Sequence, residues 1–357
     1  MKKRAIILYA EFNLDMTERA GGVAHLRATV EGLKENGYSC IVMCRFGWPL
    51  VRKEGKATYC NILALPSLHS DDQRFGNISF QSSNYPRFLK RVAKNIVTSI
   101  NFMFIDFIDL VVRPSLIIER AIKNRAFIVR KSRRNCSRVY EVNDFRYDKD
   151  ALSSADKVLI TNKNNYPPAG NYFERPWPVM ISSPIATNSK KVDCFSIAYL
   201  GSLGKWHNLP GMTKLIDDLH ANDSRWKMTV YGPEEPFYSS ALSERQHIVY
   251  GGFLGPEQIE PCLGAHGWGL MIFTQDTSTE RLGVGSPSKL IHYVVAGMQI
   301  IATKCGEEKL LDSIQDRMVF YRPEDHLECL ATIQSRALDS SKWTNIADQP
   351  LLAIYRP

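Results

Sequence analysis

The sequence predicts an α/β protein of two successive domains, each built around a parallel sheet. In the first half, a buried strand at residues 4–10, a helix and a second strand at residues 40–44 follow one another. A strand–helix–strand start of this kind is typical of parallel sheets. The same alternation restarts at residue 196, and 357 residues are enough for two domains of ordinary size. The expected domains are residues 1–185 and 186–340, followed by a terminal segment at 341–357.

The elements of the first half follow from short apolar runs and from turn residues. A helix is expected over residues 23–35, because its apolar residues recur on one face and Gly37 follows it. Further strands are expected at residues 63–66, 116–118, 139–142 and 156–160. The segment 165–184 holds five prolines and is expected to connect the two domains.

The second half has its clearest helix signal at residues 286–297. Pro287 stands at the start and Gly297 at the end, which is the usual asymmetry of helix termini. A helix start offers unpaired N–H groups that suit phosphate, and Lys289 lies in this first turn. An ordinary capped helix with a solvated lysine is the equal alternative. The other expected helices are 209–220 and 256–263, and the expected strands are 196–200, 226–231, 248–250, 269–273, 299–303 and 318–321.

Composition and charge restrict the class of protein. With 44% hydrophobic and 23% charged residues, the chain is typical of soluble globular proteins. No stretch reaches the roughly 20 apolar residues that span a bilayer, and the start is interpreted as a first strand rather than a signal peptide. Eight scattered cysteines without a CxxC pair favour reduced, buried thiols in a cytosolic protein.

Four glycine- or serine-containing turns are expected at the carboxyl ends of the second domain's strands, where parallel sheets bind ligands. They are residues 201–205, 232–233, 251–252 and 286–289. Glycines allow a ligand to approach the backbone, and Lys205 and Lys289 would approach one crevice from opposite sides. The pattern predicts a pyrophosphate cradle that needs no metal.

The motifs of this half resemble the GT-B glycosyltransferases of the GT4 type. They are residues 199–202 with Lys205, residues 230–232, and residues 286–293 with 296–297 and 300–303. Gly21-Gly22 and residues 140–144 match landmarks of the N-terminal domain in that family. The resemblance implies two Rossmann-like domains with parallel sheets facing a central cleft. It also implies a nucleotide-sugar held mainly by the second domain and a terminal segment that returns to the first.

The resemblance assigns roles to residues of this chain. Lys205 and Lys289 would hold the donor phosphates, and Ser286, Ser288 and the helix start would add hydrogen-bond donors. The Gly21-Gly22 loop would approach the phosphates from the other domain. The remaining donor-binding residues implied are Gly201, Tyr231, Gly232, Tyr250 and Gly251, with backbone around Tyr231 and Tyr250-Gly251 lining the nucleobase pocket.

One position departs from the family. His292 stands where a glutamate usually holds the nucleotide ribose, and Val284 stands where an E-x7-E pair would start. Glu280 or Asp276 could supply a carboxylate from the preceding loop. His292 could bond a ribose hydroxyl through a ring nitrogen, or it could simply pack on the helix beside Tyr293; both interpretations stay open.

For catalysis, the leaving phosphate needs positive groups and the acceptor hydroxyl needs positioning or deprotonation. Asp144 and Asp15 are the candidate general bases if the anomeric centre inverts, and they would only orient the acceptor if it is retained. Each could instead be a helix-cap or turn residue. No Asp-x-Asp lies at a strand end, so neither a metal nor another cofactor is expected.

Charge is distributed unevenly along the chain. The net charge is +8, yet residues 1–185 hold 29 Lys/Arg against 17 Asp/Glu. Residues 84–134 combine basic and aromatic residues, which predicts a surface that docks on anionic lipid. The alternative is an ordinary helix with its aromatics in the core. No nucleic-acid-binding motif accompanies the charge.

The sequence thus predicts a metal-independent glycosyltransferase that moves a sugar from a nucleotide-sugar to a saccharide or glycolipid acceptor. Its expected role is bacterial surface polysaccharide synthesis (capsule, O-antigen or lipopolysaccharide), and its expected location is the cytoplasm or the inner face of the cell membrane. Two alternatives stay open: a catalytically silent GT-B subunit that supports a partner enzyme, and a sugar-nucleotide epimerase. A nicotinamide dehydrogenase is disfavoured because neither domain has G-x-G-x-x-G after its first strand.

Overall fold

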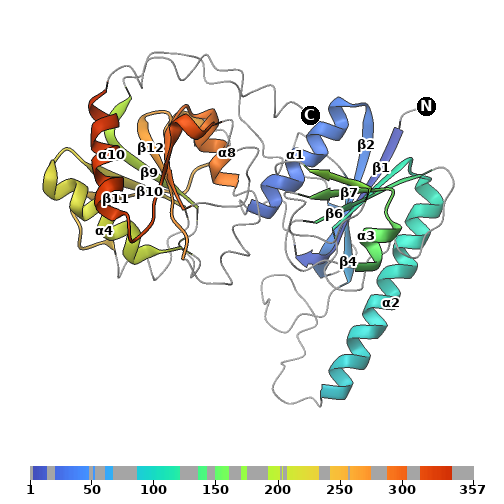
Figure 1. The fold of residues 1–357 in the computed structure, drawn as a ribbon. Helices are drawn as coiled ribbons and strands as arrows, with labels where there is room; N and C mark the ends of the chain where they lie inside the picture. The colour runs from blue at the N-terminus through green and yellow to red at the C-terminus, as the bar shows by residue number, and fades with distance from the viewer. Residues whose placement is uncertain are drawn as a thin grey trace. The chain divides into compact units, whose positions relative to one another are not determined.

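The computed structural model divides the chain into two compact units, Met1–Arg175 and Pro176–Pro357. Figure 1 shows a sheet with flanking helices in each unit. The domain limits predicted from the sequence stay predictions. The structure describes residues 3–13, 21–47, 51–52, 61–66, 87–120, 136–142, 149–160, 170–174, 192–201, 203, 207–232, 242–255, 258–274, 288–303 and 314–339.

The first unit contains an eight-stranded sheet with the order β3-β4-β2-β1-β5-β6-β7-β8. Its strand pairs are parallel except for the edge pair β3–β4. The strands are β1 (Lys3–Asn13), β2 (Tyr38–Gly47), β3 (Val51–Arg52), β4 (Asn61–Pro66), β5 (Leu116–Glu119), β6 (Ser137–Glu141), β7 (Lys157–Ile160) and β8 (Tyr172–Glu174). The helices are α1 (Gly21–Glu35), α2 (Arg87–Val112) and α3 (Lys149–Ser154).

Helices cover both faces of this sheet. The apolar side of α1 packs on one face through Leu26 and Val30. The other face is covered by α2 and α3, whose Ile105 and Leu152 belong to one buried cluster with strand residues. Burial on both faces explains why the central strands are nearly continuous apolar runs.

The strands expected in the first half are confirmed, with shifted ends, whereas β3, β8 and α3 were not predicted. The strand β8 lies inside the proline-rich segment and pairs with β7, so this segment is more than a connection. Helix α1 begins at Gly21. The expectation that Gly21 and Gly22 form a loop before the helix is therefore wrong, because both residues belong to its first turn.

The second unit contains six parallel strands in the order β11-β10-β9-β12-β13-β14. They are β9 (Asp193–Leu200), β10 (Lys227–Tyr231), β11 (Ile248–Gly252), β12 (His266–Met271), β13 (Gln299–Ala302) and β14 (Met318–Phe320). The helices are α4 (Leu209–Asn222), α6 (Ile259–Leu263), α8 (Ser288–Val295) and α10 (His326–Leu338). Every strand and helix predicted here is confirmed, with ends that differ by a few residues, and α10 was not predicted.

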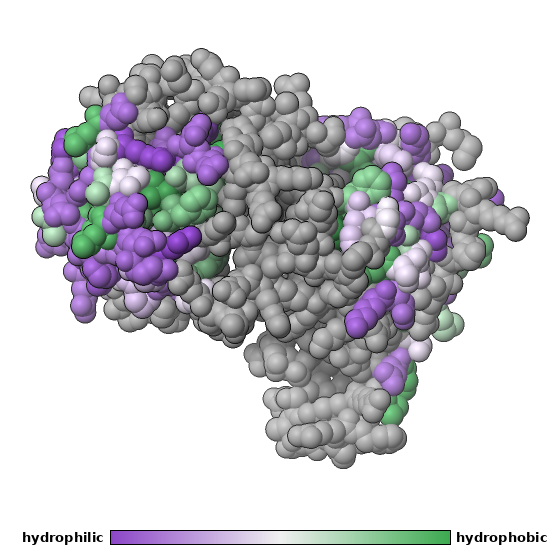
Figure 2. All heavy atoms as spheres, viewed as in Figure 1, coloured by the Kyte–Doolittle hydropathy of each residue, from purple (hydrophilic) through white to green (hydrophobic). Residues whose placement is uncertain are grey.

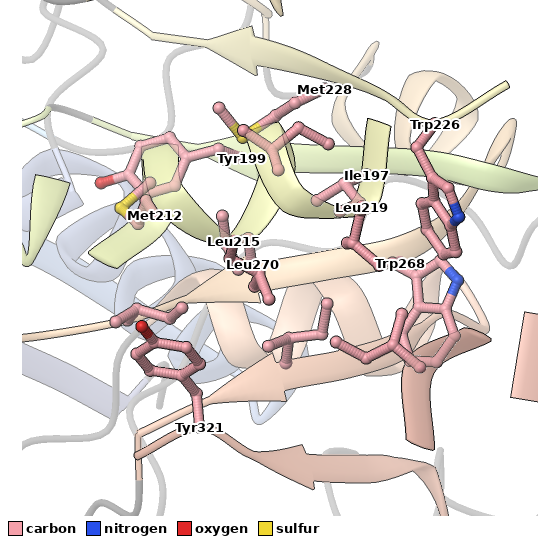
Figure 3. Packing of buried hydrophobic residues seen from close by; sticks show 14 of the residues in the cluster. Ile197, Tyr199, Met212, Leu215, Leu219, Trp226, Met228, Trp268, Leu270 and Tyr321 are labelled. Atoms are coloured by element: carbon pink, nitrogen blue, oxygen red, sulfur yellow. The ribbon is translucent and has the colours of Figure 1, made fainter. Parts of the chain in front are cut away.

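A large apolar cluster joins α4 and α10 to one face of this sheet. Figure 3 shows the indole rings of Trp226 and Trp268 close together, with centroids 6.3 Å apart. The opposite face is covered by α6 and α8 through a second cluster that includes Leu263 and Leu290. The core therefore fixes α8, the helix that was predicted to bind phosphate, against the sheet.

Two further expectations concern thiols and membrane spans. The five cysteines whose side chains are described carry thiols rather than disulfides, and burial raises the pKa of Cys40 to about 11. Among the described helices, none combines the length and apolar character needed to cross a bilayer.

Candidate functional site

The second sheet reverses its direction of winding between β9 and β12. From β9 the chain continues outward to β10 and β11, and it then returns to place β12 on the other side of β9. At such a point a parallel α/β sheet leaves a crevice beyond the carboxyl ends of its strands, where ligands bind. Gly201 directly follows β9, and Phe273 lies two residues beyond β12. The residues at this end of the sheet are therefore the candidates for a binding site.

Two glycines, one after β9 and one after β10, allow the backbone to approach closely at the carboxyl ends of these strands. Gly201 has φ +114° and its N–H donates to the carbonyl of Tyr231 over 2.8 Å. Gly232 has φ +158°, and a Cβ at this position would lie 2.3 Å from the carbonyl oxygen of Gly201. Only glycine fits such a close approach without moving the backbone. The predicted importance of these two turns thus has a structural reason, although their contact with a ligand stays a prediction.

Lys289, in the first turn of α8, extends toward the end of β9. Its Nζ donates to the hydroxyl of Tyr199 over 2.9 Å and lies 3.3 Å from Nε2 of His207. The ammonium also lies 4.2 Å from the centroid of the Tyr199 ring and 5.9 Å from that of Phe273. Gly201 is next to it, because a Cβ there would be 3.6 Å from Nζ. We call Lys289, Tyr199, His207, Phe273 and Gly201 the lysine site.

The lysine site places a basic group among aromatic rings. Burial lowers the pKa of Lys289 to about 7 from the usual 10.5. Within the described part of the chain, no carboxylate lies within ion-pair distance of this lysine. A half-buried amine surrounded by a phenol and an imidazole is a favourable place for an anion.

His207 was not predicted as a site residue from the sequence, whereas Lys205, two positions earlier, was. The residue forms an antiparallel bridge with Phe273, and its ring lies 5.3 Å from the Phe273 ring. The next residue, Asn208, caps α4 by accepting a hydrogen bond from the N–H of Gly211 over 2.9 Å. The sequence Asn-Leu-Pro is typical of a helix start, so it could have predicted that the preceding residue, His207, has a fixed position.

Tyr293 attaches α8 to the sheet beside the lysine site. Its buried hydroxyl accepts from the N–H of Leu200 over 2.9 Å and donates to the carbonyl of Leu270 over 3.1 Å. The ring lies against Gly269, where a Cβ would be 2.5 Å from the ring. These contacts fix the turn of α8 that precedes it, and hence the position of Lys289.

His292 is buried and contacts a carboxylate. Its Nδ1 lies 2.7 Å from Oε1 of Glu260 on α6, and the two side chains are 7% and 0% exposed. Because a carboxylate only accepts, Nδ1 carries the proton. The structure therefore adds a partner, Glu260, that the sequence did not reveal, and a hydrogen bond from His292 to a ribose stays a prediction.

The two tyrosines predicted near the nucleobase have other contacts. The Tyr231 hydroxyl lies 2.9 Å from Nε2 of His266, whose Nδ1 lies 2.6 Å from the hydroxyl of Ser196. Burial lowers the pKa of His266 to about 4, so this ring is neutral. The Tyr250 hydroxyl donates to the carbonyl of Gly232 over 2.7 Å. Only the backbone of these tyrosines was predicted to face a nucleobase, and that stays a prediction.

Several predicted site residues cannot be placed. Asp15, Asp144, Lys205, Glu280 and Ser286 lie outside the described residues. Ser288 is the first residue of α8, and only its backbone is described. Gly251 lies in β11 beside the ring of Tyr231. The convergence of Lys205 and Lys289 stays a prediction. In the described part of the chain, no group of three or more His, Cys, Asp or Glu residues could hold a metal ion.

Comparisons with known proteins place this architecture in a fold class. No protein-family model matches the chain, and no curated protein matches its sequence. Among solved structures, the chain is similar to sucrose-phosphate synthase from Thermosynechococcus elongatus, with 12% identity, 97% of this chain and 92% of that chain covered, and a TM-score of 0.63. A glycosyltransferase from Rickettsia africae has 14% identity, coverage of 99% and 92%, and a TM-score of 0.63.

A third similar structure is Anabaena HepE in complex with UDP and glucose. It has 12% identity, covers 99% of this chain and 95% of that chain, and has a TM-score of 0.60. These likenesses, each over nearly the whole chain, show that the protein has the GT-B fold of two Rossmann-like units. The fold class expected from the sequence is confirmed.

Proposed function

We propose that the protein is a glycosyltransferase that moves a sugar from a nucleotide-sugar to a saccharide or glycolipid acceptor. The observation that carries this proposal is the position of Lys289 in the first turn of α8. Its half-buried amine contacts Tyr199 near the end of β9 and has no carboxylate partner among the described residues. A departing diphosphate supplies the negative charge that such a site lacks. The GT-B fold supports the proposal.

In the proposed reaction, the bond between the sugar and the diphosphate breaks as the acceptor hydroxyl attacks the sugar. The ammonium of Lys289 and the N–H groups at the start of α8 would stabilise the charge that develops on the leaving phosphate. No metal is then needed for this step. Asp144 or Asp15 would accept the acceptor's proton in an inverting reaction. A role in bacterial surface polysaccharide synthesis, at the inner face of the membrane, completes the proposal.

A second candidate function is supported by one observation. His292 replaces the expected glutamate, and it is held by Glu260. A GT-B subunit that binds nucleotide but no longer transfers sugar would tolerate this change. The two functions differ in product: only the enzyme converts donor and acceptor into glycoside and nucleoside diphosphate, and only an epimerase would alter the donor without an acceptor.

The first experiment is a thermal-shift screen with UDP, GDP, CMP and their sugars. UDP and UDP-sugars come first, because HepE was solved with UDP and glucose and an Escherichia coli structure with UDP-2-fluoroglucose. A specific ligand at 100 times its Kd should stabilise the protein by about 2.7 kcal/mol. If none of the nucleotides or nucleotide-sugars raises Tm or is hydrolysed, the proposal fails.

Nucleotide binding should depend on pH through Lys289. Without ligand the pKa of Lys289 is about 7, and a bound diphosphate would raise this pKa by favouring the ammonium. Binding then takes up a proton above neutral pH. Affinity should be highest at and below about pH 7 and fall by up to about tenfold per unit at higher pH. Calorimetry in buffers of different ionisation enthalpy would count the proton. An affinity that stays constant or rises between neutral and mildly alkaline pH would contradict the expectation.

A further inference from the structure

The helix α2 carries a row of exposed apolar side chains. The first five are separated alternately by four and three residues, and the sixth lies four residues after the fourth, which keeps all six on one face of the helix. Each side chain is between 47% and 72% exposed. Large apolar residues seldom gather in this way on a monomeric soluble protein unless something covers them. The exposed row consists of Ile96, Ile100, Met103, Phe107, Leu110 and Val111.

The exposed row is distinct from the face that α2 packs against its own domain. Ile105 is almost fully buried, and Phe102, Phe104, Ile108 and Val112 pack against the same core cluster. The C-terminal half of α2 is thus apolar on two sides. Figure 1 shows α2 along the outside of the unit with its N-terminal end extending beyond the sheet, and Figure 2 shows hydrophobic atoms along its outer edge. Phe102 packs inward, as expected for an ordinary helix, whereas Phe107 is exposed, so not all of the aromatic residues lie in the core.

The stretch of sequence that contains α2 is strongly basic. Residues 84–134 hold 12 Lys/Arg against three Asp/Glu, and two of these three acids, Asp109 and Glu119, are buried. Four basic residues occupy the N-terminal turns of α2, at positions that helical spacing places opposite the row. An apolar face with a basic opposite face is the pattern of a helix that lies in the surface of an anionic bilayer. The four are Arg87, Lys90, Arg91 and Lys94.

We propose that the exposed row of α2 docks on an anionic lipid bilayer, with its apolar side chains among the acyl chains and the basic positions toward the headgroups. Charge favours lipid over a second copy of the chain. Pairing two copies would bring together two regions of like net charge, since residues 84–134 hold 12 Lys/Arg against three Asp/Glu, whereas anionic headgroups attract this region. This inference rests on the membrane location in the proposed function and deepens it, but its test does not depend on sugar transfer.

The test is co-sedimentation of the full-length protein with phosphatidylcholine vesicles, with and without phosphatidylglycerol. The I100E/F107E variant puts two carboxylates into the row. The matched control, S137E/S153E, adds the same charge at exposed positions of the same unit that lie outside α2, on β6 and α3. We expect wild-type binding only to the anionic vesicles and binding by I100E/F107E at least about tenfold weaker than by the control.

Circular dichroism should show the same helix content in all three proteins, because the altered side chains are exposed in the free protein. Equal losses in the two variants would mean that charge alone binds the lipid, which overturns the proposal. The proposal is also overturned if the wild-type protein does not bind the vesicles but forms a dimer, and the I100E/F107E variant is monomeric. The row would then contact a second copy of the chain. UDP binding, measured without vesicles, tests the proposed function independently.

Discussion

Replacement of Lys289 by methionine should abolish most of the activity while leaving the fold intact. The methionine keeps an unbranched side chain, one atom shorter, but removes the charge beside Tyr199 and His207. Loss of one preorganised group that stabilises the leaving phosphate lowers kcat by roughly 100- to 1000-fold. UDP affinity should fall as well, because diphosphate also binds in the ground state. Steady-state kinetics with the donor found in the screen would measure both.

The stability of this variant should move in the opposite direction. Because burial lowers the pKa of Lys289, the unfolded state binds its proton more tightly than the folded state does. The resulting loss of stability is largest below about pH 7 and fades toward pH 10.5, the usual lysine pKa. Lys289→Met removes it, so Tm at neutral pH should equal or exceed the wild-type value.

Lys214→Met is the matched control. Lys214 pairs with Asp218 on the surface of α4 and is 60% exposed, so its loss should change neither binding nor turnover. A Lys289→Met protein that unfolds more easily yet still binds UDP with full affinity would show that the lysine is structural. The proposed function would then lose the observation that carries it.

Much of the fold could be predicted because each element has its own local signal. Apolar strands such as β9 and the proline- and glycine-bounded helix α8 are read directly from residue spacing. The short edge strands β3 and β8 escaped prediction, because two or three residues carry no periodicity and their pairing depends on distant partners. Gly21 escaped for another reason: a helix start tolerates glycine, so its presence does not mark a loop.

The site could be predicted only in part, because contacts between distant residues leave no local pattern. Lys289 was found from its place in a helix start. Its partners Tyr199 and His207 come from β9 and from the residue before the cap of α4, which meet only in the folded sheet. Glu260 lies 32 positions from His292 in the chain. Spacing rules apply within a single helix, so they cannot identify a partner residue on another helix.

The Glu260–His292 pair should dominate the stability of the α6–α8 contact. Replacing His292 alone by leucine removes one hydrogen-bond partner of the fully buried carboxylate of Glu260, at an expected cost of about 1–3 kcal/mol. Replacing Glu260 alone by leucine should cost less, because a neutral imidazole tolerates burial better than a carboxylate does. Chemical denaturation of each variant would measure these free energies.

The double variant E260L/H292L separates stability from binding. Apolar residues often replace a buried pair of this kind without loss, so the double variant should be more stable than H292L and the two changes should be strongly non-additive. Additive effects would show that the pair is not coupled. In this stable background, UDP affinity should still be about tenfold below wild type if Nε2 of His292 bonds the ribose. If the double variant instead binds UDP with wild-type affinity, His292 is a packing residue. The protein would then be folded and would still bind the nucleotide without either member of the pair.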